Sequence, residues 1–167
     1  DENAVGFIKN YKGGKYGFAA LLPDEAIPLE EYAASLSGAR LLSVFSNAES
    51  ASVGAWLPKF SCEYSAALND ALAQMGMSSA FSSETADFTR LGSSSLGNLY
   101  IGKVIHKTFI SVSELGTRAG AASAVSIEAK SAPMYDYTVK LDRPFVYAII
   151  DNAANLPIFL GTMQIPS

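Results

Sequence analysis

The chain contains one cysteine, one histidine and no long apolar run, and each shortage argues against a class of protein. Because Cys62 is alone, no disulfide can form within the chain. A metal site built from histidine and cysteine is not expected when each occurs once. No apolar run approaches the roughly 18 residues of a membrane-spanning helix, so no membrane partner is expected. The sequence therefore predicts a protein without a metal ion or another cofactor.

Positive charge is also sparse and scattered. The 167 residues include 12 Lys and Arg against 16 Asp and Glu, and the net charge is −4. Because the cations form no cluster, nucleic acid and anionic membrane surfaces are not expected as partners. Hydrophobic residues make up 49% of the chain, which is enough for one folded domain with a sizeable core.

Turn residues and hydrophobic periodicity predict an α+β fold in which strands dominate. The glycines of the turn at 12–15 can supply the positive φ of a tight hairpin, and a second hairpin is expected around 152–155. A helix over 66–75 is expected to be capped by Ser65 and ended by Gly76. Two further short helices are expected over 29–36 and 39–45. Strands are expected over 4–11, 16–22, 51–57, 60–64, 99–114, 137–141, 145–151 and 157–163.

The most unusual part of the sequence is a long apolar strand followed by a run of small residues. Residues 99–114 alternate with period two and are apolar on both faces, which is typical of a central strand buried on both sides. Residues 116–124, GTRAGAASA, lose every bulky apolar side chain but keep the alternation. Such a segment can be a flexible linker, or it can be exposed at first and later enter a sheet without a steric penalty.

The residues themselves favour the second interpretation. The motif ELGTRAGAASA, which follows a strand carrying His106, resembles the hinge of the reactive-centre loop of serpins, a family of serine protease inhibitors. Other segments resemble the same family in order and spacing, among them WLPKF, VIHKTFISVSELGT, LDRPFVYAIID and PIFLGTMQIP. Serpins are considerably longer, so residues 1–167 are expected to be the C-terminal portion of a single serpin domain. The resemblance implies a strand-dominated α+β fold with a long central strand, a few short helices and a C-terminal β-hairpin.

The resemblance also implies inhibition by a suicide-substrate mechanism, so the protein is not expected to be an enzyme. A serine protease attacks the exposed loop and forms an acyl-enzyme, and the cleaved loop then inserts into a large sheet and distorts the protease. Insertion requires small side chains on the face that enters the sheet, because a large or charged one carries a burial cost. Thr117, Ala119 and Ala121 share that face, and Arg118 lies on the other. The implied hinge comprises Glu114, Gly116, Thr117, Arg118, Ala119, Gly120, Ala121 and Ala122.

Counting along a loop of the family's usual length places the reactive bond at Lys130–Ser131. A lysine before this bond suits a protease with an acidic specificity pocket, so a trypsin-like target is expected. Two alternatives stay open. Lys130 can be an ordinary solvated loop residue, or the register can be shifted, because residues 131–143 are somewhat longer than usual in the family. In the second case the specificity residue is Met134, Tyr135 or Tyr137.

A lone histidine on a buried strand is expected to be a hydrogen-bonded core residue, and this is the interpretation of His106. The resemblance places it in the region that controls opening of the sheet. No nucleophile motif surrounds it, so Ser-His-Asp catalysis is not expected. Cys62 is interpreted as a buried structural residue. The predicted aromatic core residues are Trp56, Phe145, Tyr147 and Phe159.

Two functions are compatible with these features. The first is a serine-type endopeptidase inhibitor, and the second is a non-inhibitory serpin scaffold or partner-binding fragment. The expected partners are a trypsin-like serine protease, the N-terminal part of the same serpin, and further copies of the chain paired through exposed strand edges. An inhibitor of this kind is expected outside the cell or at the cell surface.

Overall fold

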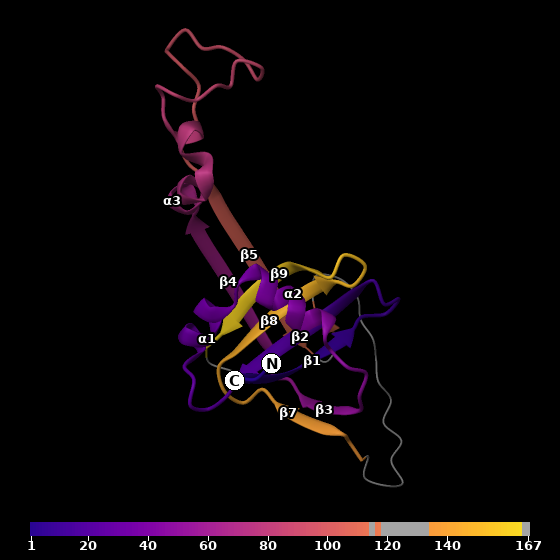
Figure 1. The fold of residues 1–167 in the computed structure, drawn as a ribbon. Coiled ribbons are helices and arrows are strands. Elements are labelled where there is room, and N and C mark those ends of the chain that lie inside the picture. Colours follow the sequence, from indigo (N-terminus) through magenta and orange to yellow (C-terminus); the bar gives the residue numbers. More distant parts are fainter. Residues whose placement is uncertain (114–115, 118–133, 165–167) are drawn as a thin grey trace. The chain divides into compact units, whose positions relative to one another are not determined.

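The computed structural model describes residues 1–113, 116–117 and 134–164. These residues form an α+β fold, as the sequence predicts (Figure 1). The chain divides into a larger unit, residues 1–60 with 111–167, and a smaller unit, residues 61–110.

The larger unit is built on a four-stranded antiparallel sheet with the strand order β1-β2-β8-β9. The strands are β1 (Ala4–Asn10), β2 (Tyr16–Pro23), β8 (Phe145–Asp151) and β9 (Leu156–Met163). Both predicted hairpins are confirmed. In the first, Gly13 and Gly14 adopt φ values of 89° and 70°, which glycine reaches without steric strain.

Two short helices lie over one face of this sheet (Figure 1). Helix α1 (Leu29–Ser35) begins directly after Pro28, and helix α2 (Gly38–Ser46) begins after Ser37, whose Oγ accepts a hydrogen bond from the Arg40 amide. Their apolar sides meet alternate residues of the strands, because successive strand residues point to opposite faces. The resulting core contains Ala4, Ala19, Leu21, Leu29, Tyr32, Leu41, Phe45, Val146, Ala148 and Ile150.

The opposite face of the sheet is packed by aromatic rings. Phe60 lies edge-on to Phe145 with ring centroids 5.9 Å apart, and 5.3 Å from the ring of Tyr147. The prediction of Phe145 and Tyr147 as core residues is confirmed, since both are buried. Phe159 is half-buried and stacks on Tyr147 at 6.2 Å. The two central strands, β2 and β8, are therefore covered on both faces.

A second, two-stranded sheet belongs to the same unit. It pairs β3 (Val53–Trp56) in parallel with β7 (Tyr137–Lys140). The predicted strand over 51–57 is thus confirmed in its central part. Because strands of a parallel pair must be joined by a long connection, this pairing joins segments that are distant in the sequence.

The smaller unit contains most of β4 (Phe60–Ala67) and β5 (Ile105–Ser113), together with α3 (Asn69–Leu72), the π-helix η1 (Ala73–Met77) and the 3₁₀-helix η2 (Ser78–Phe81). Strand β5 lies between β4 and the two-residue strand β6 (Gly116–Thr117) in a three-stranded sheet. Of the unit's residues, all of which the structure describes, two are buried, namely Ala86 and Ile110.

Two predicted boundaries in this unit are wrong. The strand expected over 99–114 begins only at Ile105, because the preceding backbone binds η2 and α3 instead of a neighbouring strand: the Ile101 amide donates to the carbonyl of Ala80, and the Val104 amide donates to Oδ1 of Asn69. The start of the helix expected over 66–75 is also wrong, because β4 continues to Ala67 and Ser65 lies in a strand and caps no helix. Helical structure begins at Asn69 with α3 and continues into η1, where Gly76 leaves the helical conformation with a φ of 105°.

Candidate functional site

The segment that carries the predicted hinge and reactive bond pairs with a strand near its N-terminal end. Strand β6 runs antiparallel to the end of β5, and Val112 pairs with Thr117 while Ser113 pairs with Gly116. Two predicted hinge residues, Gly116 and Thr117, are therefore already in a sheet. The other predicted hinge residues lie outside the residues that the structure describes, namely Glu114, Arg118, Ala119, Gly120, Ala121 and Ala122.

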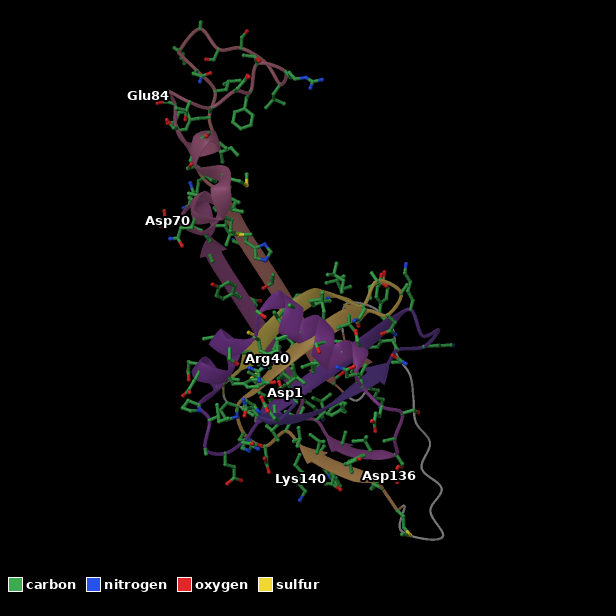
Figure 2. All side chains as sticks on the ribbon, in the orientation of Figure 1. Asp1, Arg40, Asp70, Glu84, Asp136 and Lys140 are labelled. Atoms are coloured by element: carbon green, nitrogen blue, oxygen red, sulfur yellow. The ribbon has the colours of Figure 1, made fainter. Side chains whose placement is uncertain are left out.

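The same segment is held at its C-terminal end by Asp136. The Asp136 amide donates to the Ser52 carbonyl at 2.8 Å, and Oδ2 of Asp136 accepts from the Ser52 amide at 2.8 Å. These reciprocal bonds fix the point at which the chain enters β7. Figure 2 labels Asp136, which directly precedes β7, and Lys140, its last residue. Sequence reasoning missed this contact, because the two residues are 84 positions apart and neither belongs to a motif.

The predicted reactive bond, Lys130–Ser131, also lies outside the described residues. The alternative specificity residues Met134, Tyr135 and Tyr137 are described, and all three are exposed. The ring of Tyr135 nevertheless packs directly on Gly54, where an added Cβ would lie 2.7 Å from the ring carbon Cδ2.

The prediction that Trp56 belongs to the core is wrong, since its side chain is 52% exposed. Trp56 lies on the same face of β3 as Gly54, and the ammonium of Lys140 lies 5.5 Å from the centroid of its ring. The buried Val139 belongs to the opposite face of this small sheet. Trp56 is therefore exposed because its face of β3 points outward.

The predictions for the single histidine and the single cysteine also need correction. His106 is exposed on β5 and is not a core residue: it shares a face of the strand with the buried Ile110 and Val112, but burial on that face decreases toward the His106 end. Cys62 is half-buried rather than buried.

Across the part of the chain that the structure describes, no three His, Cys, Asp or Glu side chains gather in a way that could hold a metal ion. None of the helices in that part is long and apolar enough to cross a membrane.

Comparison with known proteins identifies the class to which this fold and loop arrangement belong. The sequence profile of the family described as "Serpin (serine protease inhibitor)" matches residues 7–166, so the chain belongs to the serpin family. The predicted serpin-like α+β fold is thereby confirmed.

Individual relatives agree with this assignment. A serpin-like protein of Thermococcus kodakarensis is 38% identical over 159 residues, which cover 93% of this chain and 36% of that protein. "Intracellular coagulation inhibitor 2" of Tachypleus tridentatus is 32% identical over 154 residues, covering 92% of this chain and 37% of that protein. The crystal structure of tengpin, a thermophilic serpin, in the native state matches all of this chain with a TM-score of 0.86 and 50% identity. That match covers 43% of the tengpin chain, so this chain spans well under half the length of these proteins.

Proposed function

We propose that this chain is the C-terminal portion of a serpin that inhibits a trypsin-like serine protease as a suicide substrate. Lys130–Ser131 is the reactive bond, and Glu114 with residues 116–122 forms the hinge. The protein binds and traps an enzyme and has no catalytic activity of its own. Met134, Tyr135 and Tyr137 remain the alternative specificity residues if the register of the loop differs.

The pairing of β6 with β5 carries this proposal. An inserting loop must add a strand beside β5, and β6 already runs antiparallel to it at the first two hinge positions. If the same register continues, Ala119 lies opposite Ile110 and Ala121 lies opposite Thr108. Residues opposite each other in an antiparallel pair share one face of the sheet.

Burial along β5 explains why the hinge needs small residues on one face. Ile110 and Val112 are 2% and 4% exposed, so the face that receives Thr117 and Ala119 is the buried face of β5. On the other face, the continued register sets Ala122 opposite the exposed Lys107. A large side chain is therefore excluded at Ala121 and tolerated at Ala122.

The test uses the longer serpin chain that carries these residues at its C-terminal end, mixed with trypsin. An SDS-stable complex and a released peptide beginning at Ser131 are expected. The same substitution at two adjacent residues provides a matched pair: Ala121→Arg should turn the inhibitor into a cleaved substrate, and Ala122→Arg should preserve the complex. The 167-residue chain alone should be cleaved without trapping trypsin, because among the described residues no strand lies beyond β6 in the β4-β5-β6 sheet to hold the other edge of an inserted loop.

Three results would count against the proposal. A complex formed by the 167-residue chain alone would show that no other part is needed. If the two Arg variants behaved alike, the continued β5–β6 register could not explain why small residues are needed on one face of the hinge. Rapid cleavage of the longer chain without any complex would favour the second function, a non-inhibitory scaffold or partner-binding fragment.

We also propose that the inhibitor acts outside the cell or at the cell surface, where trypsin-like enzymes are the natural targets. The relative from Tachypleus tridentatus has "intracellular" in its name, so this part of the proposal needs its own test. Fractionation of the native source, followed by immunoblotting, should find the protein outside cells. Pairing between copies through exposed strand edges, also part of this proposal, should appear as concentration-dependent oligomers in sedimentation.

A further inference from the structure

The outward face of the β3–β7 sheet carries an exposed aromatic and basic surface made by Trp56, Tyr135 and Lys140. In the parallel register, Gly54 pairs with Thr138 and Trp56 pairs with Lys140, so these residues share one face of the sheet. The ring of Tyr135 lies on that face because it covers Gly54. Trp56 is 52% exposed and Tyr135 is 45% exposed. Neither ring belongs to the hydrophobic core described above, so packing of that core does not explain why aromatic residues occupy these two positions.

Contacts with the neighbouring backbone and side chains fix the positions of Tyr135 and Trp56 in this surface. Gly54 has no side chain, and that absence makes the seat for Tyr135, since an added Cβ would lie 2.7 Å from the ring. The reciprocal bonds between Ser52 and Asp136 fix the backbone next to Tyr135. Lys140 orients Trp56 through the cation–π contact at 5.5 Å. A surface of this kind loses little conformational entropy when a partner covers it.

We propose that the Trp56–Tyr135–Lys140 surface is a docking site for the target protease, beside the reactive bond. This inference rests on the proposed function, because the protein that docks here is the protease that attacks Lys130–Ser131. The occupant is the serine protease held at that bond, and the surface contacts the protease outside its catalytic cleft.

Chain length places the surface within reach of the bound protease. Tyr135 follows Ser131 by four residues, which span at most about 14 Å when fully extended. A typical protein interface covers about 800 Å² of each partner, which corresponds to a disc of about 16 Å radius. Tyr135 is therefore within reach of a protease centred on Lys130–Ser131, and Trp56 lies two residues along β3 from the glycine under that ring.

The composition of the surface fits this role. Tryptophan and tyrosine are enriched among the residues that dominate binding energy at interfaces, because each buries a large rigid ring with few rotatable bonds. Lysine 140 adds a positive charge that favours an acidic rim on the partner. A solvated loop end without such a role would be expected to expose polar side chains.

The experiment measures trypsin cleavage of the 167-residue chain, with mass spectrometry following the product that begins at Ser131. Trp56→Ala and Tyr135→Ala should each lower kcat/KM for this bond about tenfold, through a higher KM with unchanged kcat. Gly54→Ala should act in the same direction, because it displaces the ring of Tyr135 without removing it. Tyr100→Ala is the matched control, because Tyr100 is 52% exposed like Trp56 but belongs to the smaller unit. The kcat/KM for cleavage of this variant should stay within about twofold of the value for the original chain.

A direct measurement covers the case in which a variant folds poorly. Trp56 is the only tryptophan of the chain, so a 5-fluorotryptophan label gives a single ¹⁹F resonance. Adding unlabelled trypsin with its catalytic serine replaced by alanine should shift or broaden this resonance. Trp56→Phe, which keeps a ring, should recover most of the kcat/KM that Trp56→Ala loses.

The outcomes separate this inference from the proposed function. Cleavage at Lys130–Ser131 at equal rates in all variants, with an unmoved ¹⁹F resonance, would overturn the docking site and leave the reactive bond standing. Cleavage elsewhere would overturn the reactive bond and the docking site together. A resonance that shifts with the concentration of the chain alone would assign the surface to contacts between copies, and this would also overturn the proposal.

Discussion

The two units of this chain use similar sequence patterns with opposite results. In the larger unit, β2 and β8 carry apolar residues on both faces and are buried on both faces of the sheet. In the smaller unit, β5 also carries apolar residues on both faces, yet Ile105 and Phe109 are 56% and 52% exposed. The difference teaches that apolar residues on both faces predict a strand but not its burial. Burial requires a second layer, and helices and aromatic rings supply that layer only in the larger unit.

The largest expected effect compares two phenylalanines, one from each unit. Phe145→Ala removes a fully buried ring that contacts Phe60 and Tyr147, and it should lower the free energy of unfolding by about 3–5 kcal/mol. Phe109→Ala removes a half-exposed ring and should cost less than about 1 kcal/mol. Urea unfolding followed by circular dichroism measures both. Equal losses would mean that Phe109 is buried in solution and that the comparison fails.

Two glycines sharpen the same contrast. A Cβ added at Gly6 in β1 would run into the carbonyl oxygen of Ala20 on the neighbouring strand, so Gly6→Ala should cost about 1–3 kcal/mol. No described heavy atom beyond its chain neighbours comes within 4 Å of a Cβ added at Gly102, so Gly102→Ala should change stability by no more than about 0.5 kcal/mol. Thermal unfolding of both variants checks this pair. A tolerated Gly6→Ala would show that β1 and β2 can move apart.

Alkaline pH should weaken the larger unit through Tyr32. Burial raises the pKa of the Tyr32 hydroxyl above its ordinary value near 10, although the charge of Arg40 lowers it in part. A raised pKa in the folded state contributes stability that is present below the unfolded pKa and is lost as the pH rises through the folded pKa. The free energy of unfolding should therefore fall above about pH 10.

The matched variant for this effect is Tyr32→Phe, which has no hydroxyl to titrate. Its stability should be lower at neutral pH, because Tyr32 Oη donates to Asp1 Oδ2 at 3.2 Å, and it should fall less steeply above about pH 10. Urea titrations between about pH 8 and pH 11 measure the difference in slope. Parallel curves for the two proteins would mean that Tyr32 does not carry the effect.

The smallest effect belongs to Asp87 in the smaller unit. The Thr89 hydroxyl donates to Oδ1 of Asp87 at 2.7 Å and, together with the Thr89 amide, lowers the pKa of this carboxyl below 3.8. A lowered pKa contributes stability that is present above the unfolded value and is lost as the pH falls through the folded value. Because the carboxyl is exposed, only the local turn should respond. Thr89→Val should return the NMR titration of Asp87 toward its ordinary range, and an unchanged titration would exclude the hydroxyl as the cause.

Local features of the fold could be predicted from neighbouring residues. The hairpin at Gly13 and Gly14 follows from the positive φ that glycine adopts freely, and the short helix expected over 39–45 is present as α2. The serpin assignment was also accessible, because it rests on several motifs in order along the chain. Each of these predictions needed only residues close together in the sequence.

The candidate site could be predicted only in part. The hinge pattern could be found in the sequence, and the hinge role stays a prediction; the structure describes the pairing of Gly116 and Thr117 with β5. The bonds between Ser52 and Asp136 and the seat of Tyr135 on Gly54 could not be found, because each joins residues more than 80 positions apart. Local pattern carries no information about such pairs.

The sequence by itself determined the strands, the turns and the family, since backbone preferences and motifs act over a few residues. The tertiary structure alone decided which face of each strand is covered. It placed Trp56 outward, left His106 exposed and buried Phe145, although all three lie on strands. The physical reason is that burial depends on the layer that packs against a strand, and that layer comes from distant parts of the chain.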